Sequence, residues 1–475
     1  MDNKPQLKQF FSATYKELEK LNLEARSITD NAKAQSKHTV FLKKEDGIKA
    51  LTVCFSDIEG RLHMLDYDKK FLLDSVNNLT FDGSSIRGFS ELHESDLRLV
   101  LDWTSLTYLP ADVFGPGKVI IFANIADREL KPYESDFRGK LQQYTKELKK
   151  LTGIEANMAP EIEGFLLDGK DAEQHYSEDN GFKLISTGGY FHSLPLDDLR
   201  KFIDATAEAQ RAMGFKNEKD HPEVAPSQFE INFKYTDVVR ACDQVLLYKL
   251  VCRQVAENMG LTATFLPKPI QELNGNGMHT NFSLAKNGKN LFYSKKGKDG
   301  LSDVAWDFVD RILNRAPEIA LVLNSSVNAY RRLDPNYEAP NQIKVSANDR
   351  GSMIRVPFAN ETTSRIEIRS VAPDANPYLL LFTIIKTGLE DKIPASSPNI
   401  RKRLRFLPSS INDAMRIFRT SDYITKLMGE SSKDKFLQYK QASANRNPRE
   451  LGNHIKASEI LYHHEVTNQF LWNKF

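Results

Sequence analysis

The feature that most constrains this chain is a pair of acidic residues inside an apolar segment, MAPEIEGFLL, at residues 158–167. Glu161 and Glu163 are two residues apart in it. The apolar content predicts a strand, and alternate side chains of a strand share one face. Two carboxylates on one face repel each other, and burying either one without a partner is costly or raises its pKa. The fold must therefore supply something that cancels this charge.

Three more segments place reactive side chains in strand-like surroundings. HPEVAPSQFEINF contains Glu223 and Glu230, and NGNGMHTNF places His279 after a glycine-rich turn. In SRIEIRS, Glu367 lies between two isoleucines that take the opposite face. Taken singly, each has an ordinary explanation. An isolated acidic residue of a strand usually faces solvent, and a lone histidine is more often hydrogen-bonded than bound to a metal.

Together, these five carboxylates and one imidazole form a plausible ligand set for hard divalent cations. Mg²⁺ and Mn²⁺ take oxygen ligands with an occasional histidine. Two such ions can clamp phosphate oxygens and neutralise the charge that develops during phosphoryl transfer. From the residues alone, a two-metal phosphoryl-transfer site is one hypothesis, and unrelated solvated side chains are the other.

Composition narrows the class of protein. The chain has 475 residues, 40% hydrophobic and 27% charged, which is typical of a globular protein of more than one domain. A net charge of +2 gives no sign of nucleic-acid or membrane binding, and no apolar run reaches the roughly 18 residues of a membrane span. The basic run RKRLR at 401–405 favours a solvated face or a subunit contact over nucleic acid. Three cysteines without metal-site spacing predict reduced thiols in a cytoplasmic protein.

The order of apolar runs predicts the domain organisation. An amphipathic helix is expected over residues 6–34, within an N-terminal extension of residues 1–39. Short alternating runs predict a β-rich domain at 40–132. Over 133–475, strands alternate with helices, which predicts an α+β fold with antiparallel pairing. The expected helices are 137–153, 196–213, 237–259, 302–314, 375–389 and 411–418.

Segments spread from about residue 50 to 390 carry a resemblance to a known family. They include FDGSSIRGFSELHESDLRLVLD, APEIEGFLLD, GGYF, HPEVAPSQFEINF, TATFLPKPIQELNGNGMHTNFSL, NAYRRLDPNYEAP, IRVPFANETTSRIEIR and PDANPYLL. In content and order they resemble glutamine synthetase of the type I class. One segment alone is moderately specific, whereas all of them in the family's order exclude chance.

The resemblance implies an ATP-dependent ligation of ammonia to the γ-carboxylate of L-glutamate through γ-glutamyl phosphate. It also implies a small β-grasp N-terminal domain, and a large catalytic domain with a curved antiparallel sheet and surrounding helices. Family members form a dodecamer of two hexameric rings with active sites between neighbouring subunits. The expected partners are L-glutamate, ammonium, ATP and further copies of the chain. The expected cofactor is Mg²⁺ or Mn²⁺, with two or more ions per active site.

Matched position by position, the metal ligands fall into two sets. Those that match the metal near glutamate are Glu163, Glu223 and Glu230. Those that match the metal near the nucleotide phosphates are Glu161, His279 and Glu367. The resemblance thus implies that each of the paired acids in MAPEIEGFLL binds a different ion.

Further residues match substrate contacts of the family. Arg350 and Arg355 match arginines that contact phosphate, and their fixed positive forks suit a phosphoryl group. Without the resemblance, surface ion pairing would be favoured for both. The residues that match the glutamate site are Asn274, Gly275, His279, Arg332 and Arg369. The residues that match nucleotide contacts, besides the two arginines, are Glu218, Tyr235, Asn281 and Ser283.

The second half of the reaction requires an amine nucleophile. Asp82 and Ser85 match the family's ammonium site, to which both are donated by the neighbouring subunit. Tyr190 and Glu223 complete that pocket in the family pattern. A small anionic, closed pocket favours ammonium over larger amines.

Two more residues match the reacting centre. Glu338 matches a flap glutamate that closes the site and takes a proton, and closure excludes water that would hydrolyse the acyl phosphate. His221 matches a histidine suited to electrostatic stabilisation. The segment between Tyr378 and Tyr423 contains no tyrosine, which predicts that this chain lacks the adenylylation control found in many type I relatives.

Two alternatives stay open at this point. A sister ligase would attach the γ-glutamyl group to a polyamine or another amine, with the same fold, metals and ATP chemistry. A non-catalytic relative would lack metal ligands or the flap glutamate, and all of these are present. Phosphate release measured with different amines distinguishes glutamine synthetase activity from these two alternatives.

Overall fold

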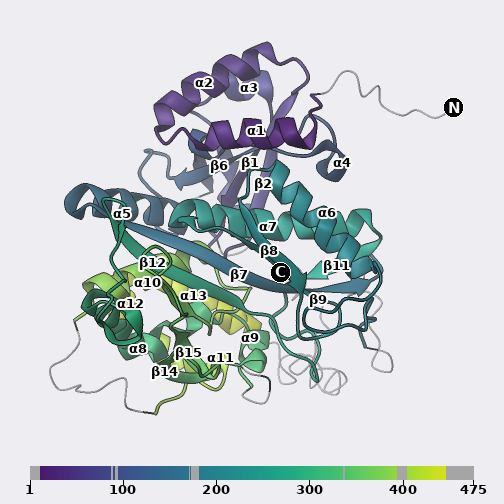
Figure 1. The fold of residues 1–475 in the computed structure, drawn as a ribbon. Coiled ribbons are helices and arrows are strands. Elements are labelled where there is room, and N and C mark those ends of the chain that lie inside the picture. Colours follow the sequence, from purple (N-terminus) through teal and green to yellow (C-terminus); the bar gives the residue numbers. More distant parts are fainter. Residues whose placement is uncertain are drawn as a thin grey trace, which may run out of the picture.

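The computed structural model describes residues 11–86, 89–90, 95–170, 172, 181–334, 337, 339–392 and 404–444. A smaller N-terminal domain lies on a larger part that is built around one long strand, β7 (Figure 1). One hydrophobic core lies mainly in the N-terminal domain, and a second fills the larger part and extends into the N-terminal sheet at Cys54, Ile120 and Phe122. The domain bounds 1–39, 40–132 and 133–475 stay a prediction.

The N-terminal domain is a mixed sheet covered by helices. The strand order is β2-β1-β6-β4-β3, with β5 paired to β6; β1 and β6 run parallel and the other pairs antiparallel. Its strands are β1 (Ala50–Ser56), β2 (Leu62–Asp68), β3 (Thr80–Asp82), β4 (Asp96–Leu101), β5 (Thr107–Tyr108) and β6 (Val119–Ala126). Its helices are α1 (Tyr15–Arg26), α2 (Asn31–Lys44), α3 (Lys69–Asp74) and α4 (Ala111–Phe114), with short 3₁₀ turns η2 (Gly83–Ser85) and η4 (Trp103–Ser105).

The expectation of one helix over residues 6–34 is wrong. The described part of this segment holds α1 and the start of α2, separated by a short connection. The reason is local capping, because the Asp30 side chain accepts a hydrogen bond from the Lys33 backbone N–H and starts a new helix. Leu18 of α1 and Leu42 of α2 are buried in the N-terminal core, so both helices belong to this domain's packing.

His38 of α2 makes the stability of this domain dependent on pH. It is 3% exposed, and its Nε2 has no hydrogen-bond partner among the described residues. Burial, followed by the charge of Lys37, lowers the pKa of His38 to about 4. Because the unfolded chain binds the proton at higher pH, the stabilisation is complete above about pH 6.5 and is lost as the pH falls toward 4. We expect the urea midpoint of His38→Leu to change less than that of the parent between about pH 7 and pH 5. Equal changes in the two proteins would contradict this assignment.

The larger part contains a ten-stranded sheet. Its main path is β14-β15-β16-β12-β7-β9-β8; β10 and β11 also pair with β7, and β13 with β12. All pairs are antiparallel except β14 with β15. The strands are β7 (Ile154–Asp168), β8 (Asn217–Pro222), β9 (Gln228–Phe233), β10 (Thr236–Asp237), β11 (Leu261–Thr264), β12 (Met278–Lys286), β13 (Lys289–Asn290), β14 (Gln342–Ser346), β15 (Ser352–Arg355) and β16 (Ile366–Ile368). The α+β prediction is confirmed, with one parallel pair that the sequence did not predict.

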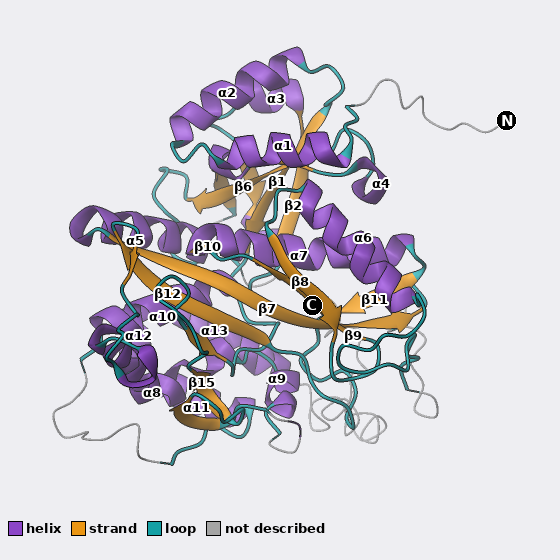
Figure 2. Ribbon diagram, in the orientation of Figure 1, coloured by secondary structure: helices purple, strands orange, loops and turns teal. Residues whose placement is uncertain are grey.

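Helices flank this sheet (Figure 2). They are α5 (Phe137–Thr152), α6 (Asp198–Ala212), α7 (Val238–Asn258), α8 (Asp303–Leu323), α9 (Val327–Arg332), α10 (Pro377–Glu390), α11 (Ile411–Thr420), α12 (Asp422–Met428) and α13 (Glu430–Ala444), with the 3₁₀ turn η5 (Lys298–Gly300). Helix α8 is longer than the predicted 302–314, because it continues through Pro317. Buried apolar residues on both sides of the proline hold the added turns in the core.

A buried ionic cluster joins the two parts of the molecule. Arg138 of α5 is 1% exposed at its side chain, and its Nη2 lies 2.9 Å from Asp102 Oδ2 and 2.8 Å from Asp243 Oδ2. Its Nε donates to Asp243 Oδ1, and the Tyr378 hydroxyl donates to the same oxygen. Burial opposes ionisation of Asp102, but the Arg138 charge and the hydrogen bonds from Thr104 and Arg138 together outweigh burial and lower the pKa of Asp102 to about 2. Asp102 follows β4 and Asp243 lies on α7, so one guanidinium ties the N-terminal sheet to the larger part.

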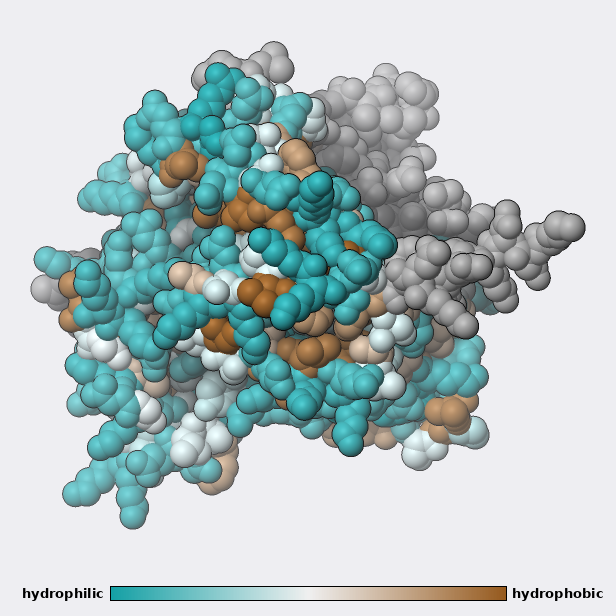
Figure 3. Space-filling model, turned by 90° about the horizontal axis from the view of Figure 1, so that it is seen from above, coloured by the Kyte–Doolittle hydropathy of each residue, from teal (hydrophilic) through white to brown (hydrophobic). Residues whose placement is uncertain are grey.

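The molecular surface is mainly polar. Figure 3 views the molecule from above, the side of α1 and α2, and shows small, separate apolar areas among hydrophilic side chains. Leu23, Val40 and Phe71 are exposed apolar residues of this domain. Within the described ranges, no helix is both long and apolar enough to cross a membrane.

Candidate active site

The register of β7 separates the two acids that share its face. Glu161 lies opposite His279 of β12, and its Oε2 is 3.6 Å from His279 Nδ1. Glu163 lies opposite Glu230 of β9, and its Oε2 accepts a hydrogen bond of 2.6 Å from the backbone N–H of Gly277. The two carboxylates therefore lie opposite different residues of the neighbouring strands, although Glu163 Oε1 also lies 4.0 Å from His279 Nε2.

The other predicted ligands converge on the same place. His221, at the end of β8, lies 3.6 Å from Glu223 and 3.5 Å from Glu230. Glu367 of β16 is fully buried, where Arg355 Nε donates to it at 2.6 Å and Arg369 Nη1 at 3.1 Å. His279 Nδ1 is 3.9 Å from the same carboxylate, so Glu367 borders the Glu161 side of the site.

The carboxylates create a buried excess of negative charge. Burial, and then the charges of Glu163 and Glu230, raise the pKa of Glu223 to about 8. Burial also raises the pKa of Glu163, with the Glu230 charge acting in the same direction against His279. Glu161 behaves in the opposite way. Burial opposes its ionisation, but His279, Lys219 and Asn281 together outweigh burial and lower the pKa of Glu161 to about 2. A cation beside Glu163 and Glu223 would relieve this repulsion.

The donor atoms suit divalent metal ions. Ligand atoms of Glu161, Glu230 and His279 lie within 4.8 Å of one another, and so do those of His221, Glu223 and Glu230. Carboxylate oxygens with one imidazole on each side match the preference of Mg²⁺ and Mn²⁺. The first group contains Glu161 and His279 and the second contains Glu223, as in the two predicted ligand sets. Glu230 belongs to both groups, whereas the prediction placed it only with the metal near glutamate. The individual metal assignments stay predictions.

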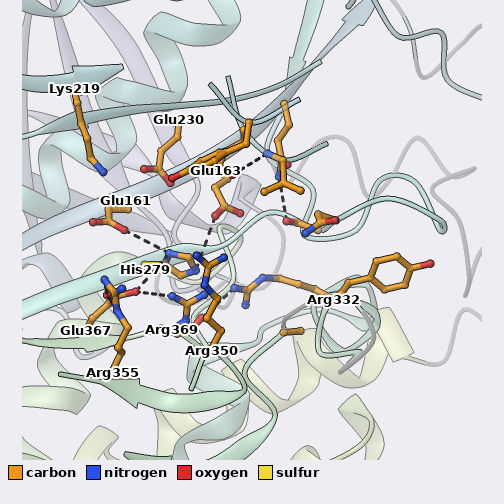
Figure 4. A pocket seen from close by; sticks show the side chains of 18 residues that line it. Glu161, Glu163, Lys219, Glu230, His279, Arg332, Arg350, Arg355, Glu367 and Arg369 are labelled. Atoms are coloured by element: carbon orange, nitrogen blue, oxygen red, sulfur yellow. Dashed lines mark hydrogen bonds and ion pairs between the residues drawn. The ribbon is translucent and has the colours of Figure 1, made fainter. Parts of the chain in front are cut away.

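Arginines face the carboxylates across a cavity of about 290 Å³ (Figure 4). Arg350, Arg355 and Arg369 lie on the side opposite Glu161. Arg332 of α9 donates from Nη2 to the Arg369 carbonyl at 3.0 Å. Arg332 Nη1 and Arg369 Nε are buried without a hydrogen-bond partner among the described residues, so these donors are available to an anion. One cavity thus offers ligands for cations and donors for anions.

The glycine-rich turn before β12 allows the close approach of these groups. Asn274 and Gly275 line the cavity, and Gln228 Nε2 donates to the Gly275 carbonyl at 3.1 Å. A Cβ on Gly277 would lie 2.6 Å from Arg332 Nη2 and 2.8 Å from His279 Nε2. Any larger residue at Gly277 would displace His279 or Arg332. Glycine is therefore needed here for the space beside these side chains, in addition to the backbone freedom that a turn uses.

A second cavity, of about 840 Å³, adjoins the first and shares Glu161 and Lys219 with it. It is lined by four of the residues predicted to contact the nucleotide, which are Glu218, Tyr235, Asn281 and Ser283. Asn281 connects the two regions, since its Nδ2 donates to Glu161 at 3.2 Å and its Oδ1 accepts from Arg365 Nε at 2.8 Å. The predicted arginines Arg350 and Arg355 line the smaller cavity instead, next to the carboxylates.

The predicted amine residues divide between two places. Tyr190 lines the first cavity and is half exposed. Asp82 and Ser85 lie in the N-terminal domain, exposed, where both Ser84 and Ser85 hydroxyls donate to the Asp82 carboxylate. They line neither of these two cavities of the described chain, and their role at a neighbouring subunit stays a prediction. Glu338 lies outside the described residues, as does most of the basic run at 401–405 and of the segment that follows α10.

Sequence reasoning missed several lining residues. They are Lys219, Val224, Gln228, Tyr337 and Ala339. Gln228 had a detectable signal, because it shares a strand face with Glu230 two residues later. Lys219 and Val224 had none, since their position depends on how β8 and the following turn pack against β7.

Comparisons with known proteins agree with this geometry. The family model described as "Glutamine synthetase, catalytic domain" matches residues 134–454. The model described as "Glutamine synthetase, beta-Grasp domain" matches residues 47–128, which confirms the expected β-grasp domain. Among solved structures, the chain is similar to the GmaS/ADP complex in conformation 1, with a TM-score of 0.74 at 24% identity, covering 91% of this chain and 100% of that one. Apo GmaS without ligand gives the same values. At this identity, the likeness concerns the fold.

Curated relatives are closer in sequence. Glutamine synthetase of Staphylococcus aureus (strain MRSA252) is 36% identical over 419 residues, which is 84% of this chain and 92% of that protein. Glutamine synthetase of Methanosarcina mazei is 36% identical over 406 residues, 82% of this chain and 89% of that protein. The two family models and these matches over more than four fifths of the chain together show that the chain belongs to the glutamine synthetase family.

Proposed function

We propose that this protein ligates ammonia to the γ-carboxylate of L-glutamate, using ATP and forming L-glutamine, ADP and phosphate through γ-glutamyl phosphate. The observation that carries the proposal is the pair of adjoining cavities that share Glu161. One is large enough for a nucleotide and holds the four predicted nucleotide contacts. The other combines carboxylates with arginines, as required where two anions must react.

Glutamate would bind in the smaller cavity. The buried, unpartnered donors Arg332 Nη1 and Arg369 Nε would bind its carboxylates, and the Asn274–Gly275 segment would contact its backbone. Mg²⁺ or Mn²⁺ held by the two ligand groups would neutralise phosphate oxygens and the attacking carboxylate. Arg350 and Arg355 would bind the transferring phosphoryl group, whose spreading negative charge suits a planar guanidinium. His221 would support Glu223 and Glu230 electrostatically.

The amine site would be completed by a second copy of the chain. Tyr190 and Glu223 supply one wall, while Asp82 and Ser85 of the same chain are exposed and line neither cavity. Around the cavity mouth, Phe191 and Val224 are exposed at 58% and 41%, which is consistent with a surface that another subunit covers. A homo-oligomer, as the dodecamer of the family, fits this division. In this scheme Glu338 takes a proton from the ammonium adduct.

A cytoplasmic location is part of the proposal. The three free cysteines, Cys54, Cys242 and Cys252, are all buried, which is compatible with a reducing compartment.

The amine substrate decides between this proposal and its alternatives. We expect phosphate release that depends on ATP, glutamate and Mg²⁺ and is fastest with ammonium, and we expect glutamine as the product by mass spectrometry. Putrescine, spermidine and ethylamine should give little release, because the closed anionic pocket suits a small cation. Release with only the larger amines would assign the chain to a sister ligase. No release with any amine from folded oligomer that binds Mg²⁺ would show a non-catalytic relative.

Two variants serve as controls for the source of the activity. Glu367→Gln removes the carboxylate between Arg355, Arg369 and His279 and should lose nearly all release. Glu129→Gln makes the same chemical change at an exposed position of the N-terminal domain, where Glu129 pairs with Lys131, and should retain full release.

A further inference from the structure

Lys219 of β8 lies where the two cavities of the proposed active site meet. Among the described residues, only Glu161 and Lys219 line both the cavity of about 290 Å³ and the cavity of about 840 Å³. A phosphoryl group that leaves a nucleotide in the larger cavity for glutamate in the smaller one has to cross this junction. The junction therefore carries one carboxylate, which is a predicted metal ligand, and one ammonium group outside the predicted set of substrate contacts.

A β-bulge in β8 directs Lys219 to this junction. Asn217 of β8 lies opposite Phe233 of β9. Lys219 lies opposite the adjacent residue, Asn232, so Glu218 is an extra residue in β8. In a regular strand, neighbouring side chains point to opposite faces. Here both Glu218 and Lys219 line the larger cavity, because a bulge changes the direction of a side chain locally.

The pairing after the bulge places Lys219 on the face of the sheet that carries the predicted metal ligands. Lys219 and His221 are two residues apart on β8, so they share a face. His221 lies opposite Glu230, and Glu230 lies opposite Glu163 of β7. Residues directly opposite each other in antiparallel strands have their side chains on the same side of the sheet. The position of Lys219 is thus set by strand pairing and does not depend on its rotamer.

The Lys219 ammonium group has no fixed partner. The residue is exposed, and within the described ranges it makes no hydrogen bond and no ion pair. Figure 4 shows it on the side of Glu161, across the cavity from Arg350 and Arg355. Burial raises the pKa of Glu161, whereas His279 and then the charge of Lys219 lower it, so the ammonium group acts on the junction. An anion bound there would have arginines on one side and Lys219 on the other.

The alternative role for Lys219 is to balance the negative charge of the carboxylates. Divalent ions bound to those carboxylates would neutralise the same charge, which leaves the ammonium group free for another anion. A phosphoryl group in transfer is such an anion, because its negative charge is spread over three oxygens. Lysine suits this partner as a mobile point charge, whereas the arginines bind it with a fixed fork.

We propose that Lys219 binds the γ-phosphoryl group of the nucleotide and stabilises it during transfer to glutamate, from the side opposite Arg350 and Arg355. The inference rests on the proposed ligase function and makes Lys219 one of its catalytic residues. In this step the bond between the γ-phosphorus and the ADP oxygen breaks, and a γ-carboxylate oxygen of glutamate bonds to the phosphorus. No proton is gained or lost, so the ammonium group keeps its proton and contributes positive charge.

Nucleotide binding tests this role without turnover. Titration calorimetry with Mg²⁺ compares ADP with β,γ-imido-ATP, which keeps the γ-phosphoryl group and is not a substrate for transfer. Lys219→Met should weaken the triphosphate about tenfold or more, as expected for loss of a charge-assisted hydrogen bond, and should change ADP binding less than about twofold. Lys219→Arg keeps the charge and should retain most of the triphosphate affinity. Because the side chain is exposed and unpaired, neither change should affect folding.

Lys216→Met is the matched control. Lys216 is an exposed lysine of the same segment, just before β8, and it lines neither active-site cavity. It should bind both nucleotides like the parent. In turnover with ammonium at saturating ATP and glutamate, Lys219→Met should release phosphate about tenfold or more slowly than Lys216→Met.

The outcomes separate this inference from the proposed function. Equal weakening of ADP and β,γ-imido-ATP by Lys219→Met would show that the lysine only adds positive charge to the site, and would overturn the inference. Unchanged affinity for both nucleotides would overturn it as well. No phosphate release by the parent with any amine would refute the proposed function. Release by the parent, together with an unaltered preference for the triphosphate in Lys219→Met, would refute only the role of Lys219.

Discussion

Glu161→Gln is expected to remove Mn²⁺ binding on the His279 side of the active site, and Glu163→Gln is expected to remove it on the Glu223 side. Each variant should weaken Mn²⁺ binding at one of the two sites by more than about 100-fold. Loss of an outer-shell partner already costs up to about 100-fold in metal affinity, and loss of a direct ligand should cost more. The reason is the register of β7, which sets Glu161 opposite His279 and Glu163 opposite Glu230. Mn²⁺ titrations followed by electron paramagnetic resonance and calorimetry measure the two classes separately.

A control variant is available on the same strand. Glu155→Gln makes the same chemical change on β7, at a residue that pairs with Lys149 outside both active-site cavities. It should bind both ions like the parent. If Glu161→Gln and Glu163→Gln each weakened Mn²⁺ binding equally at both sites, the two carboxylates would act as one group and the strand would not divide the site.

Arg138→Met is expected to lower the free energy of unfolding by about 3–5 kcal/mol, which is typical of removing one partner from a buried ion pair. The methionine fills much of the space but leaves Asp102 and Asp243 buried without their cation. Thermal and urea unfolding of the purified protein measure the loss. Because the pKa of Asp102 is about 2, against a usual value of 3.8, its contribution is complete above pH 3.8 and is lost as the pH falls toward 2.

An exposed ion pair in the N-terminal domain serves as the control for the effect of burial on the strength of an ion pair. Arg128 lies 2.7 Å from Asp96, and both side chains are about two-thirds exposed. Arg128→Met should change stability by no more than about 1 kcal/mol, because solvent screens exposed pairs. The triple variant Arg138→Met, Asp102→Asn, Asp243→Asn should recover part of the loss, since no unpaired charge remains. A loss as small as that of Arg128→Met would mean that the cluster does not hold the two parts together.

The fold class and most helices of the larger part could be predicted from local sequence. Helices α5, α6, α7, α10 and α11 lie within a few residues of their predicted positions, because their apolar periodicity and capping residues are close together in the chain. The single N-terminal helix was wrong because one capping residue, Asp30, outweighs the periodic pattern around it. The length of α8 was underestimated because tertiary packing tolerates Pro317 inside the helix.

The types of residue in the site could be predicted, whereas their partners could not. Carboxylates in apolar strands are visible in the sequence because they conflict with burial. Which of them meets His279, which meets Glu230, and which is held by arginines depends on strands that are far apart in the chain.

The sequence by itself determined that MAPEIEGFLL must meet compensating charge, since two acids on one strand face repel wherever that strand is placed. Only the tertiary structure decided that the residue opposite Glu161 is His279 and the residue opposite Glu163 is Glu230. The residue opposite each carboxylate is set by the order and register of the strands in the sheet, and neither is encoded within the strand itself.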